Sequence, residues 1–398
     1  MPYHSCEAYI ARLVAKGYKV AICEQTENPA TAKGLVKRDI IRVVTPGTVI
    51  EDAMLEEGKN NFLAAVSVTE DGVGLCFTDA STGECHATVL GTDNSVSFVA
   101  DELARFNPKE LLISEDLEKA SAELGTYISE KFPQTVTVRP RESFNAQKTE
   151  PLLVKHFGES RLKELSVDSK NPMASAVGAV IDYLYETGKN GNISVNKLDA
   201  YSGTQYMRLD MTAIRNLELS ETMRTKSKKG SLLWVLDKTK TAMGKRLIRS
   251  WLQKPLINIT GINLRQNAVE ELGSDTGLRG EATEYLSGKK DVERLMSRVV
   301  YGTASARDLN AVADAAHRFP ILKNLLSAVN CKMLREIYSD IDTLEDIAEL
   351  IDRAIVDDPP FSVREGGLIR DGFNEELDLI RGDMNSGTYF LTEMENRE

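Results

Sequence analysis

The chain has 398 residues, of which 42% are hydrophobic and 27% are charged, the composition of an ordinary globular protein. At about 100–200 residues per domain, this length predicts two or three domains, each able to bury its own core. The formal net charge of −11 excludes a protein that coats nucleic acid non-specifically, but it leaves room for a local basic site.

Cysteine and histidine content limits the metal and redox chemistry of the chain. The five cysteines include no CxxC pair and the four histidines are scattered, so zinc-ligand spacing is absent and no metal site is predicted. Cys76 and Cys85 flank a predicted hairpin turn, where a reduced pair is the favoured interpretation. No apolar run approaches the roughly 18 residues of a membrane span, and no signal peptide opens the chain. We therefore expect a cytoplasmic protein.

Residues 1–57 have the pattern of part of a small α/β unit. An amino-terminal helix is followed by short predicted strands at 18–23 and 40–45, and Pro46-Gly47 closes the second strand. A unit of this size is marginal on its own. The helix also begins almost at the first residue, so we expect the domain to be incomplete at its amino end.

Residues 58–170 predict an α/β domain. Strands at 62–69, 74–78 and 84–90 are joined by short turns and form an antiparallel meander. Helices and strands then alternate to about residue 165. This order of elements predicts an RNase-H-like topology.

Residues 171–398 are almost entirely helical in pattern. A compact apolar helix at 174–185 comes first, and further helices are predicted at 241–254, 263–272, 278–287, 289–299, 304–317, 320–328 and 340–355. The closing stretch carries a heptad-like apolar stripe and predicts a rod of roughly 40 Å. Because no Gly or Pro stop signal precedes Glu398, we expect the natural chain to continue. The fold class predicted for the whole chain is multidomain, α/β plus all-α.

The most basic run lies between Arg224 and Lys254, with ten lysines or arginines against a single acid, Asp237. Ser231 and Thr241 are the predicted N-caps of two helices within this run, and Pro255 stops the second. On the wheel of the second helix, one half is apolar and the other half is basic. The apolar half holds Met243, Leu247, Ile248, Trp251 and Leu252, and the basic half holds Lys245, Arg246 and Arg249.

Spacing alone leaves two interpretations of this amphipathic helix open. In the structural interpretation, Trp251 anchors the apolar half in a core and the basic half is a solvated face. In the functional interpretation, the basic half contacts phosphate groups. The same choice is open for Lys33, Lys37, Arg38 and Arg42, which surround a loop that leads into a strand and could supply sequence-independent affinity for DNA.

Catalytic motifs are weak throughout the chain. The Gly244-Lys245 pair lacks the first glycine and the following Ser or Thr of a P-loop, so no ATP site is predicted. A metal-dependent nuclease of RNase-H-like fold would need clustered carboxylates, whereas Asp79 and Glu84 flank a turn, where Asp is favoured by turn geometry alone. We expect no enzyme here. A nuclease and a helical interaction scaffold are the alternatives to be tested.

Six long stretches, collinear along the chain, are more specific than any single motif. They are MPYHSCEAYIARLVAKGYKVAICEQ, GLVKRDIIRVVTPGTV, FTDASTGE, YMRLDMTAIRNLELSE, GSLLWVLDKTKTAMGKRLIRSWLQKPL and GGLIRDGFNEELDLIRGDM. In these stretches the chain resembles the bacterial MutS family of DNA mismatch-recognition proteins.

The resemblance implies an architecture. Residues 1–57 would be the later part of a mismatch-binding domain, 58–170 a connector domain of RNase-H-like fold without nuclease activity, and 171–398 a helical core with a lever helix that leads to a clamp. The family's Phe-x-Glu wedge, its clamp and its ATPase domain would lie outside these residues. We therefore expect a fragment that is neither an ATPase nor a complete mismatch sensor.

The resemblance also implies partners and a location. The expected partners are double-stranded DNA with mismatches and, through the connector domain, MutL. ATP and Mg would bind the whole protein only, which would be a homodimer, whereas this fragment would be a monomer. The expected location is cytoplasmic and nucleoid-associated. Tyr3, His4, Lys33 and Arg38 are expected on the DNA-facing side of the first domain. The basic helix shifts toward the structural interpretation, as a hub that contains Trp234, Trp251, Leu247 and Gly244.

Overall fold

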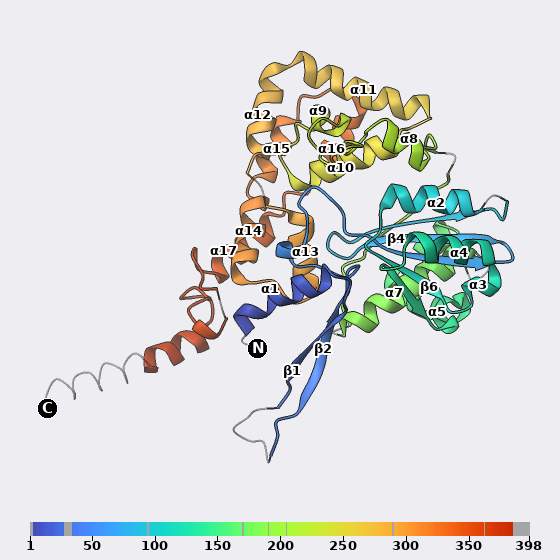
Figure 1. Cartoon of the computed structure of the whole chain (residues 1–398). Helices are drawn as coiled ribbons and strands as arrows, with labels where there is room; N and C mark the ends of the chain where they lie inside the picture. Colours follow the sequence, from blue (N-terminus) through green and yellow to red (C-terminus); the bar gives the residue numbers. More distant parts are fainter. Residues whose placement is uncertain are drawn as a thin grey trace, which may run out of the picture. The chain divides into compact units, whose positions relative to one another are not determined.

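The computed structural model describes residues 3–27, 34–93, 95–168, 171–189, 191–203, 205–288, 290–361 and 363–384. The chain forms two compact units. Unit 1 comprises Met1–Val269 and Leu286–Thr303, and unit 2 comprises Glu270–Tyr285 and Ala304–Glu398. The chain is therefore a mixed α/β protein, in which all the described strands belong to unit 1 (Figure 1).

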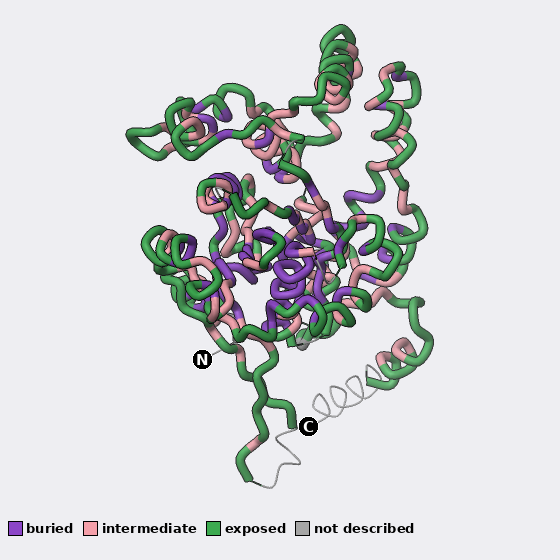
Figure 2. Tube along the Cα trace, turned by 90° about the vertical axis from the view of Figure 1, so that its right-hand side faces the viewer, coloured by how far each residue is buried: buried purple, intermediate pink, exposed green. Residues whose placement is uncertain are grey.

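Unit 1 begins with a helix and a hairpin. Helix α1 (Tyr3–Val14) is followed by strands β1 (Val20–Gln25) and β2 (Arg38–Val44), which overlap the two predicted strands and pair antiparallel. A small core of Ile10, Val14, Val44 and Val49 packs the base of the hairpin against the helix. Away from this base both strands are largely exposed, as the green colour of the hairpin in Figure 2 shows.

A six-stranded sheet forms the centre of unit 1, with strand order β7-β6-β3-β4-β5-β8. Its strands are β3 (Leu63–Thr69), β4 (Gly72–Asp79), β5 (Glu84–Leu90), β6 (Glu110–Ser114), β7 (Val136–Arg139) and β8 (Lys197–Ala200). Strands β3, β4 and β5 form the predicted antiparallel meander, and β6, β7 and β8 each join it in parallel pairs. Gly72 and Gly83 lie in the tight turns of this meander and adopt positive φ, which glycine permits without strain.

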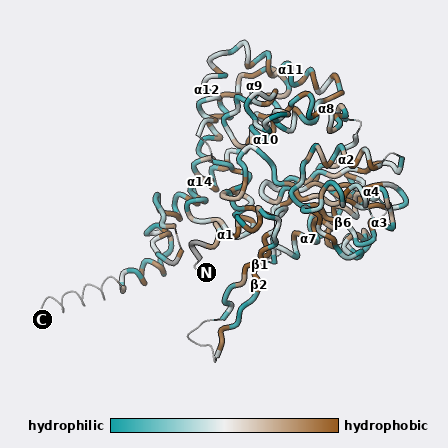
Figure 3. Tube along the Cα trace, in the orientation of Figure 1, coloured by the Kyte–Doolittle hydropathy of each residue, from teal (hydrophilic) through white to brown (hydrophobic). Residues whose placement is uncertain are grey.

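Helices cover both faces of this sheet, and hydrophobic segments, brown in Figure 3, gather there. One face packs on α5 (Ala146–Phe157) and α7 (Pro172–Gly188), and the other on α2 (Ser95–Phe106) and α4 (Ala122–Lys131). Short helices α3 (Leu117–Ala120) and α6 (Glu159–Glu164) complete this region. The approach of α7 is so close that a Cβ on Gly74 would lie 2.0 Å from the Pro172 carbonyl oxygen.

The predicted boundary near residue 170 is wrong. Helix α7 has 14 of its 17 residues buried, against the sheet and α5, and β8 extends the sheet beside β5. Both elements belong to the domain built around the six-stranded sheet, called the sheet domain below, which therefore reaches about residue 200. The error has a physical reason: an all-round apolar pattern shows that a helix is buried, but not whether a sheet or other helices bury it.

The helices after the sheet follow the predicted series with two differences. In chain order they are α8 (Met211–Asn216), α9 (Leu232–Leu236), α10 (Ala242–Gln253), α11 (Ile259–Ser274), α12 (Thr276–Leu286), α13 (Val292–Val300), α14 (Ala306–Ala316), α15 (Phe319–Leu325), α16 (Lys332–Asp340) and α17 (Glu345–Ala354). Helix α16 was not predicted. Of the predicted closing rod, residues 375–384 are helical, residues 370–374 form a turn and a bend instead, and residues 385–398 lie outside the described residues.

Unit 2 is held by polar contacts at the ends of its helices. The capping box of Ser305 and Asp308 begins α14. Beside it, the Arg307 guanidinium lies 3.7 Å from the Phe361 ring centroid and donates to the Pro359 carbonyl. Within the described residues of both units, no helix is long and apolar enough to cross a membrane.

Candidate functional site

Residues 45–61, here called the strap, connect β2 to β3, and their upstream end is held by the buried carboxylate of Glu110 in β6. One Glu110 oxygen accepts hydrogen bonds from the Thr45 hydroxyl and from the Gly47 amide at 3.0 Å. The other accepts from the Thr137 and Tyr183 hydroxyls, each at 2.7 Å. Burial and this neighbouring carboxylate raise the pKa of Tyr183, so its hydroxyl stays a donor. A fully satisfied buried carboxylate thus fixes where the strap begins.

The downstream end of the strap is held through its main-chain carbonyl oxygens. Four consecutive carbonyl oxygens, those of residues 56, 57, 58 and 59, accept hydrogen bonds from arginines of α10 and α13. Arg294 donates to the oxygens of Glu56 (3.0 Å) and Lys59 (2.9 Å). Arg246 donates to Glu57 and Arg249 to Gly58, each at 3.3 Å. Arg246, Arg249 and Arg294 are called the clamp below.

Carboxylates anchor the clamp from behind. Arg246 and Arg294 are each only 3% exposed, and Arg246 forms a two-pronged ion pair with Asp291 (2.5 and 2.8 Å) and a further bond to Glu293. Asp291 is also the N-cap of α13. Burial alone would lower the pKa of Arg246, but its bonds to these two carboxylates raise it overall. The strap, α10 and α13 therefore share one buried charge network.

The predicted hub has the wrong face inward. Trp234 is 48% and Leu247 54% exposed, whereas Arg246, predicted on the outer face, is almost completely buried. Trp251 is half-buried, with the Arg265 guanidinium 3.6 Å from its ring centroid. The helical period tells which residues share a face but not which face is inward. Here the partners of the basic face come from residues 56–59 and 291–293, far away in the sequence.

Gly244-Lys245 does not form a nucleotide site. Gly244 lies within α10, where its amide is bound by the Thr241 cap at 3.0 Å, and the Lys245 amine pairs with Glu57 at 2.9 Å. A phosphate-binding loop needs free amides and a free lysine at a strand-to-helix turn. ATP and Mg therefore do not fit these residues.

Lys254, at the end of α10, occupies an aromatic cage that the sequence did not predict. Its amine lies 4.3 Å from the ring centroid of Phe106, 5.1 Å from that of Tyr201 and 6.0 Å from that of Tyr206. Burial lowers the pKa of Lys254 to about 8, against the pull of nearby carboxylates such as Glu102. The ring faces favour the cation while the loss of water disfavours it. This cage fastens α10 to the sheet domain.

We expect Lys254 to make the stability of unit 1 depend on pH. Between pH 8 and 10.5 the folded chain holds a neutral amine while the unfolded chain still binds the proton, so stability rises with pH by at most about 1.4 kcal/mol per unit. Below about pH 8 both states are protonated and the cost of burying the charge is constant. Urea unfolding of Lys254→Met should lack this rise, and Lys163→Met, at an exposed lysine, should keep it. Parallel profiles for parent and Lys254→Met would contradict the assignment.

The four predicted DNA-facing residues are placed only in part. Tyr3 and His4 lie in the first turn of α1, but their side chains, like all of Lys33, are outside the described residues. Arg38 begins β2, is exposed and pairs with Gln25 across the hairpin. Arg42 is not free for phosphate, since its guanidinium binds Glu51 at 2.5 Å and the Thr48 carbonyl at 3.2 Å.

Asp79, the carboxylate on which the nuclease alternative rests, is fully buried and serves the turn and the strap. Its oxygens accept hydrogen bonds from Asn60 and from the Asn61 amide, each at 3.0 Å, and from the Ser81 amide and hydroxyl at 2.9 and 2.7 Å. Four donors occupy the positions that a cation would need. The described residues also contain no group of three or more His, Cys, Asp or Glu placed to hold a metal.

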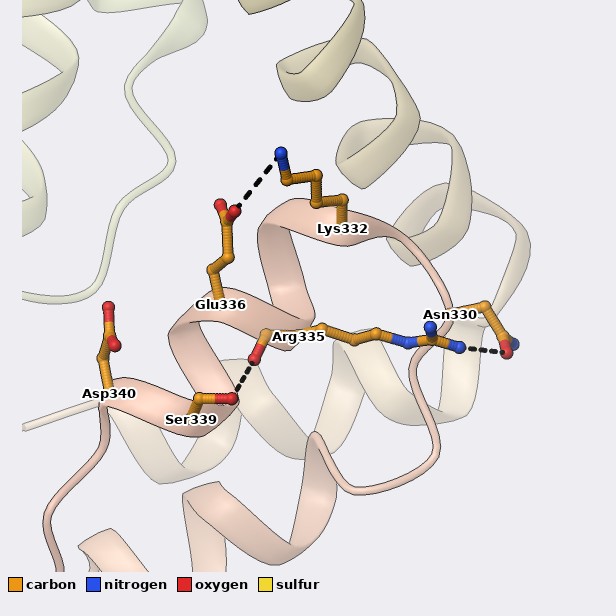
Figure 4. A pocket seen from close by; sticks show the side chains of 6 residues that line it. All are labelled: Asn330, Lys332, Arg335, Glu336, Ser339 and Asp340. Atoms are coloured by element: carbon orange, nitrogen blue, oxygen red, sulfur yellow. Dashed lines mark hydrogen bonds and ion pairs between the residues drawn. The ribbon is translucent and has the colours of Figure 1, made fainter.

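Two further features do not make a site. The Cys76 and Cys85 sulfurs face each other at 3.6 Å as free, buried thiols. In unit 2, an open pocket on α16 is lined by charged and polar residues: Asn330, Lys332, Arg335, Glu336, Ser339 and Asp340. Figure 4 shows that Lys332 pairs with Glu336 and Arg335 with Asn330, so these four side chains are engaged with one another.

Comparison with known proteins gives the family. The family model for MutS domain I matches residues 1–53, that for MutS domain II residues 61–199, and that for MutS domain III residues 212–397. The DNA mismatch repair protein MutS of Ruminiclostridium cellulolyticum is 42% identical over 395 residues, 99% of the chain. Its counterpart in Acetivibrio thermocellus is 41% identical over 408 aligned positions, which cover the whole chain. The chain belongs to the MutS family.

The MutS domain limits agree with the structure. Domain II ends at 199, within β8, which supports the corrected boundary near 200 rather than 170. The strap spans the interval between the matches to MutS domains I and II. The chain spans about 45% of the length of the two MutS relatives named above.

Sequence reasoning missed Glu110, Arg294 and Lys254. Glu110 left one signal, a lone carboxylate at the start of an apolar strand, which burial makes costly unless several donors satisfy it. For Arg294 and Lys254 no local pattern distinguishes a clamp or a caged amine from a surface cation.

Proposed function

We propose that this chain supplies the hairpin part of the mismatch-binding domain, the RNase-H-like connector and the helical core of a MutS protein, which as a whole binds mispaired or unpaired bases in duplex DNA. The ordered match to MutS domains I, II and III over nearly the whole chain carries the proposal. ATP binding, which would be coupled to mismatch recognition, falls to parts of the whole protein outside this chain. Contact with MutL falls to the sheet domain, and dimerisation to the whole protein.

The exposed hairpin supports the DNA-facing role of domain I. Both strands are solvent-exposed toward the tip, and Arg38 forms no ion pair that the described residues show. Exposed cations that lack a protein partner are available to phosphate, and they fix the register of a protein on DNA without reading its sequence. Arg38 is therefore proposed as a phosphate contact near the bound duplex. Lys33 lies outside the described residues and is proposed as a second contact from the family resemblance alone.

Charge reversal tests this role. In a chimaera in which the chain replaces the matching 395 residues of the Ruminiclostridium relative, we expect Lys33→Glu with Arg38→Glu to weaken duplex binding and to lower the salt slope by about 2. Binding is measured by fluorescence anisotropy between 50 and 200 mM salt, with matched and mismatched duplexes. The control is Arg141→Glu with Lys148→Glu, two exposed cations of the sheet domain.

The outcomes separate three ideas. An unchanged slope in the hairpin variant would overturn the phosphate role of these residues. Equal affinity of the unmutated chimaera for matched and mismatched duplexes would overturn mismatch recognition itself. Manganese-dependent cleavage that Asp79→Asn abolishes would instead support the nuclease alternative, against which the four hydrogen bonds to Asp79 argue.

A further inference from the structure

The strap is held at intervals along its length, by side chains from β6, β2, α10 and α13. Upstream, Glu110 of β6 binds Thr45 and Gly47. In the middle, Arg42 of β2 binds Glu51, and Arg298 of α13 binds Asp52 at 2.5 Å. Downstream, the clamp binds the carbonyls of residues 56–59. Because the strap is held at so many positions, a displacement of the hairpin is expected to shift the residues that the clamp binds.

Within the strap, the clamp binds main-chain carbonyl oxygens rather than side chains. A guanidinium has five donors in a rigid plane, so one arginine can hold a strap carbonyl and a carboxylate at the same time. Arg246 does this between Glu57 and Asp291, and the Asp291 side chain also caps α13. The buried Nε atoms of Arg246 and Arg294 already lack a hydrogen-bond partner among the described residues, so moving the strap carbonyls would leave further donors of these guanidiniums unpaired and disturb the start of α13.

We propose that the strap and its clamp form a mechanical link, through which a change in the position of the hairpin domain reaches α10 and α13. The hairpin end acts on Thr45, the strap carries the displacement to residues 56–59, and the clamp passes it to the amino-terminal turn of α13. The duplex as the natural source of this displacement rests on the proposed function. The link itself does not.

Hydrogen exchange tests the link in the chain as it stands. Thr45→Val removes the strap hydroxyl that binds Glu110, whereas Thr137→Val removes a hydroxyl that binds Glu110 from β7, outside the strap. We expect Thr45→Val to speed amide exchange in α13 by about three- to tenfold, and Thr137→Val by less than about twofold. Equal effects of the two variants would overturn the link, because both would then act through Glu110 alone.

Breaking part of the clamp should weaken the connection between the two ends. An Arg294→Met background loses two of the four carbonyl bonds but keeps those of Arg246 and Arg249, so the effect of Thr45→Val on α13 exchange is expected to fall at least by about half relative to the parent. If that background does not fold, Arg294→Lys keeps the charge but not the planar pair of donors, and should reduce the Thr45 effect at least by about half. A Thr45 effect that survives the clamp substitution in full would overturn the proposal.

A second arm uses the chimaera and a mismatched duplex. Duplex binding should alter α13 exchange more in the parent than in Arg294→Met, at equal occupancy of the duplex. If the chimaera binds no duplex, the proposed function fails while the Thr45 experiment still decides the link. If it binds duplex and α13 exchange changes equally in both proteins, the link fails while the function stands.

Discussion

Replacing Arg246 with methionine is expected to lower the free energy of unfolding of unit 1 by about 3–5 kcal/mol. The substitution removes the two-pronged partner of the buried Asp291, which among the described residues then keeps only the longer ion-pair contact with Arg294 at 3.6 Å, and breaking a buried ion pair costs about that much. Both tryptophans lie in unit 1, so tryptophan fluorescence during urea unfolding reports this unit directly.

A matched control lies one residue away. Lys245 also pairs with an acid, Glu57, but that pair is largely solvated, so Lys245→Met should cost less than about 1 kcal/mol. Neutralising the stranded acids should restore part of the loss, so we expect Arg246→Met with Asp291→Asn and Glu293→Gln to be more stable than Arg246→Met alone. A cost for Arg246→Met no larger than for Lys245→Met would show that the clamp is not a buried network.

Replacing Glu110 with alanine is expected to have a similar effect, about 3–5 kcal/mol. Three buried hydroxyls and the Gly47 amide would lose their acceptor, and each unsatisfied buried donor costs about 1–3 kcal/mol before relaxation. Urea unfolding measures the loss. Glu110→Gln retains one acceptor oxygen and should cost less.

The control for this position is Glu130→Ala, at an exposed glutamate of α4, which should stay within about 0.5 kcal/mol of the parent. If Glu110→Ala were as mild as this control, water would have to satisfy the four donors, and the strap would have no fixed upstream end.

The features predicted from sequence are those whose cause is local. The strands β3, β4 and β5 follow from β-favouring runs bounded by turn residues, and the caps Ser231 and Thr241 from short polar side chains that satisfy free helix amides. Helix α10 ends before Pro255 for the same kind of reason. Local chemistry thus predicted most of the elements, and the family resemblance predicted how they divide into domains.

The features that escaped prediction depend on partners distant in the sequence. Glu110 bonds to residues 65 and 73 positions away, and Arg294 to a carbonyl 238 positions away. The inward turn of Arg246 depends on Asp291 and Glu293, so a helical wheel drawn from one helix could not show it. The placement of α7 and β8 in the sheet domain likewise depends on β4 and β5, not on their own residues.

Because the clamp binds carbonyl oxygens of the strap, it limits which sequence changes residues 56–59 can accept. Every residue carries a carbonyl, so replacing the side chains of residues 56–59 leaves the four acceptors in place. Inserting or deleting a single residue there shifts all four acceptors against three fixed guanidiniums. The strap should therefore tolerate substitutions at residues 56–59 but not insertions or deletions. Residue-by-residue comparison of sequences would not reveal this constraint on length.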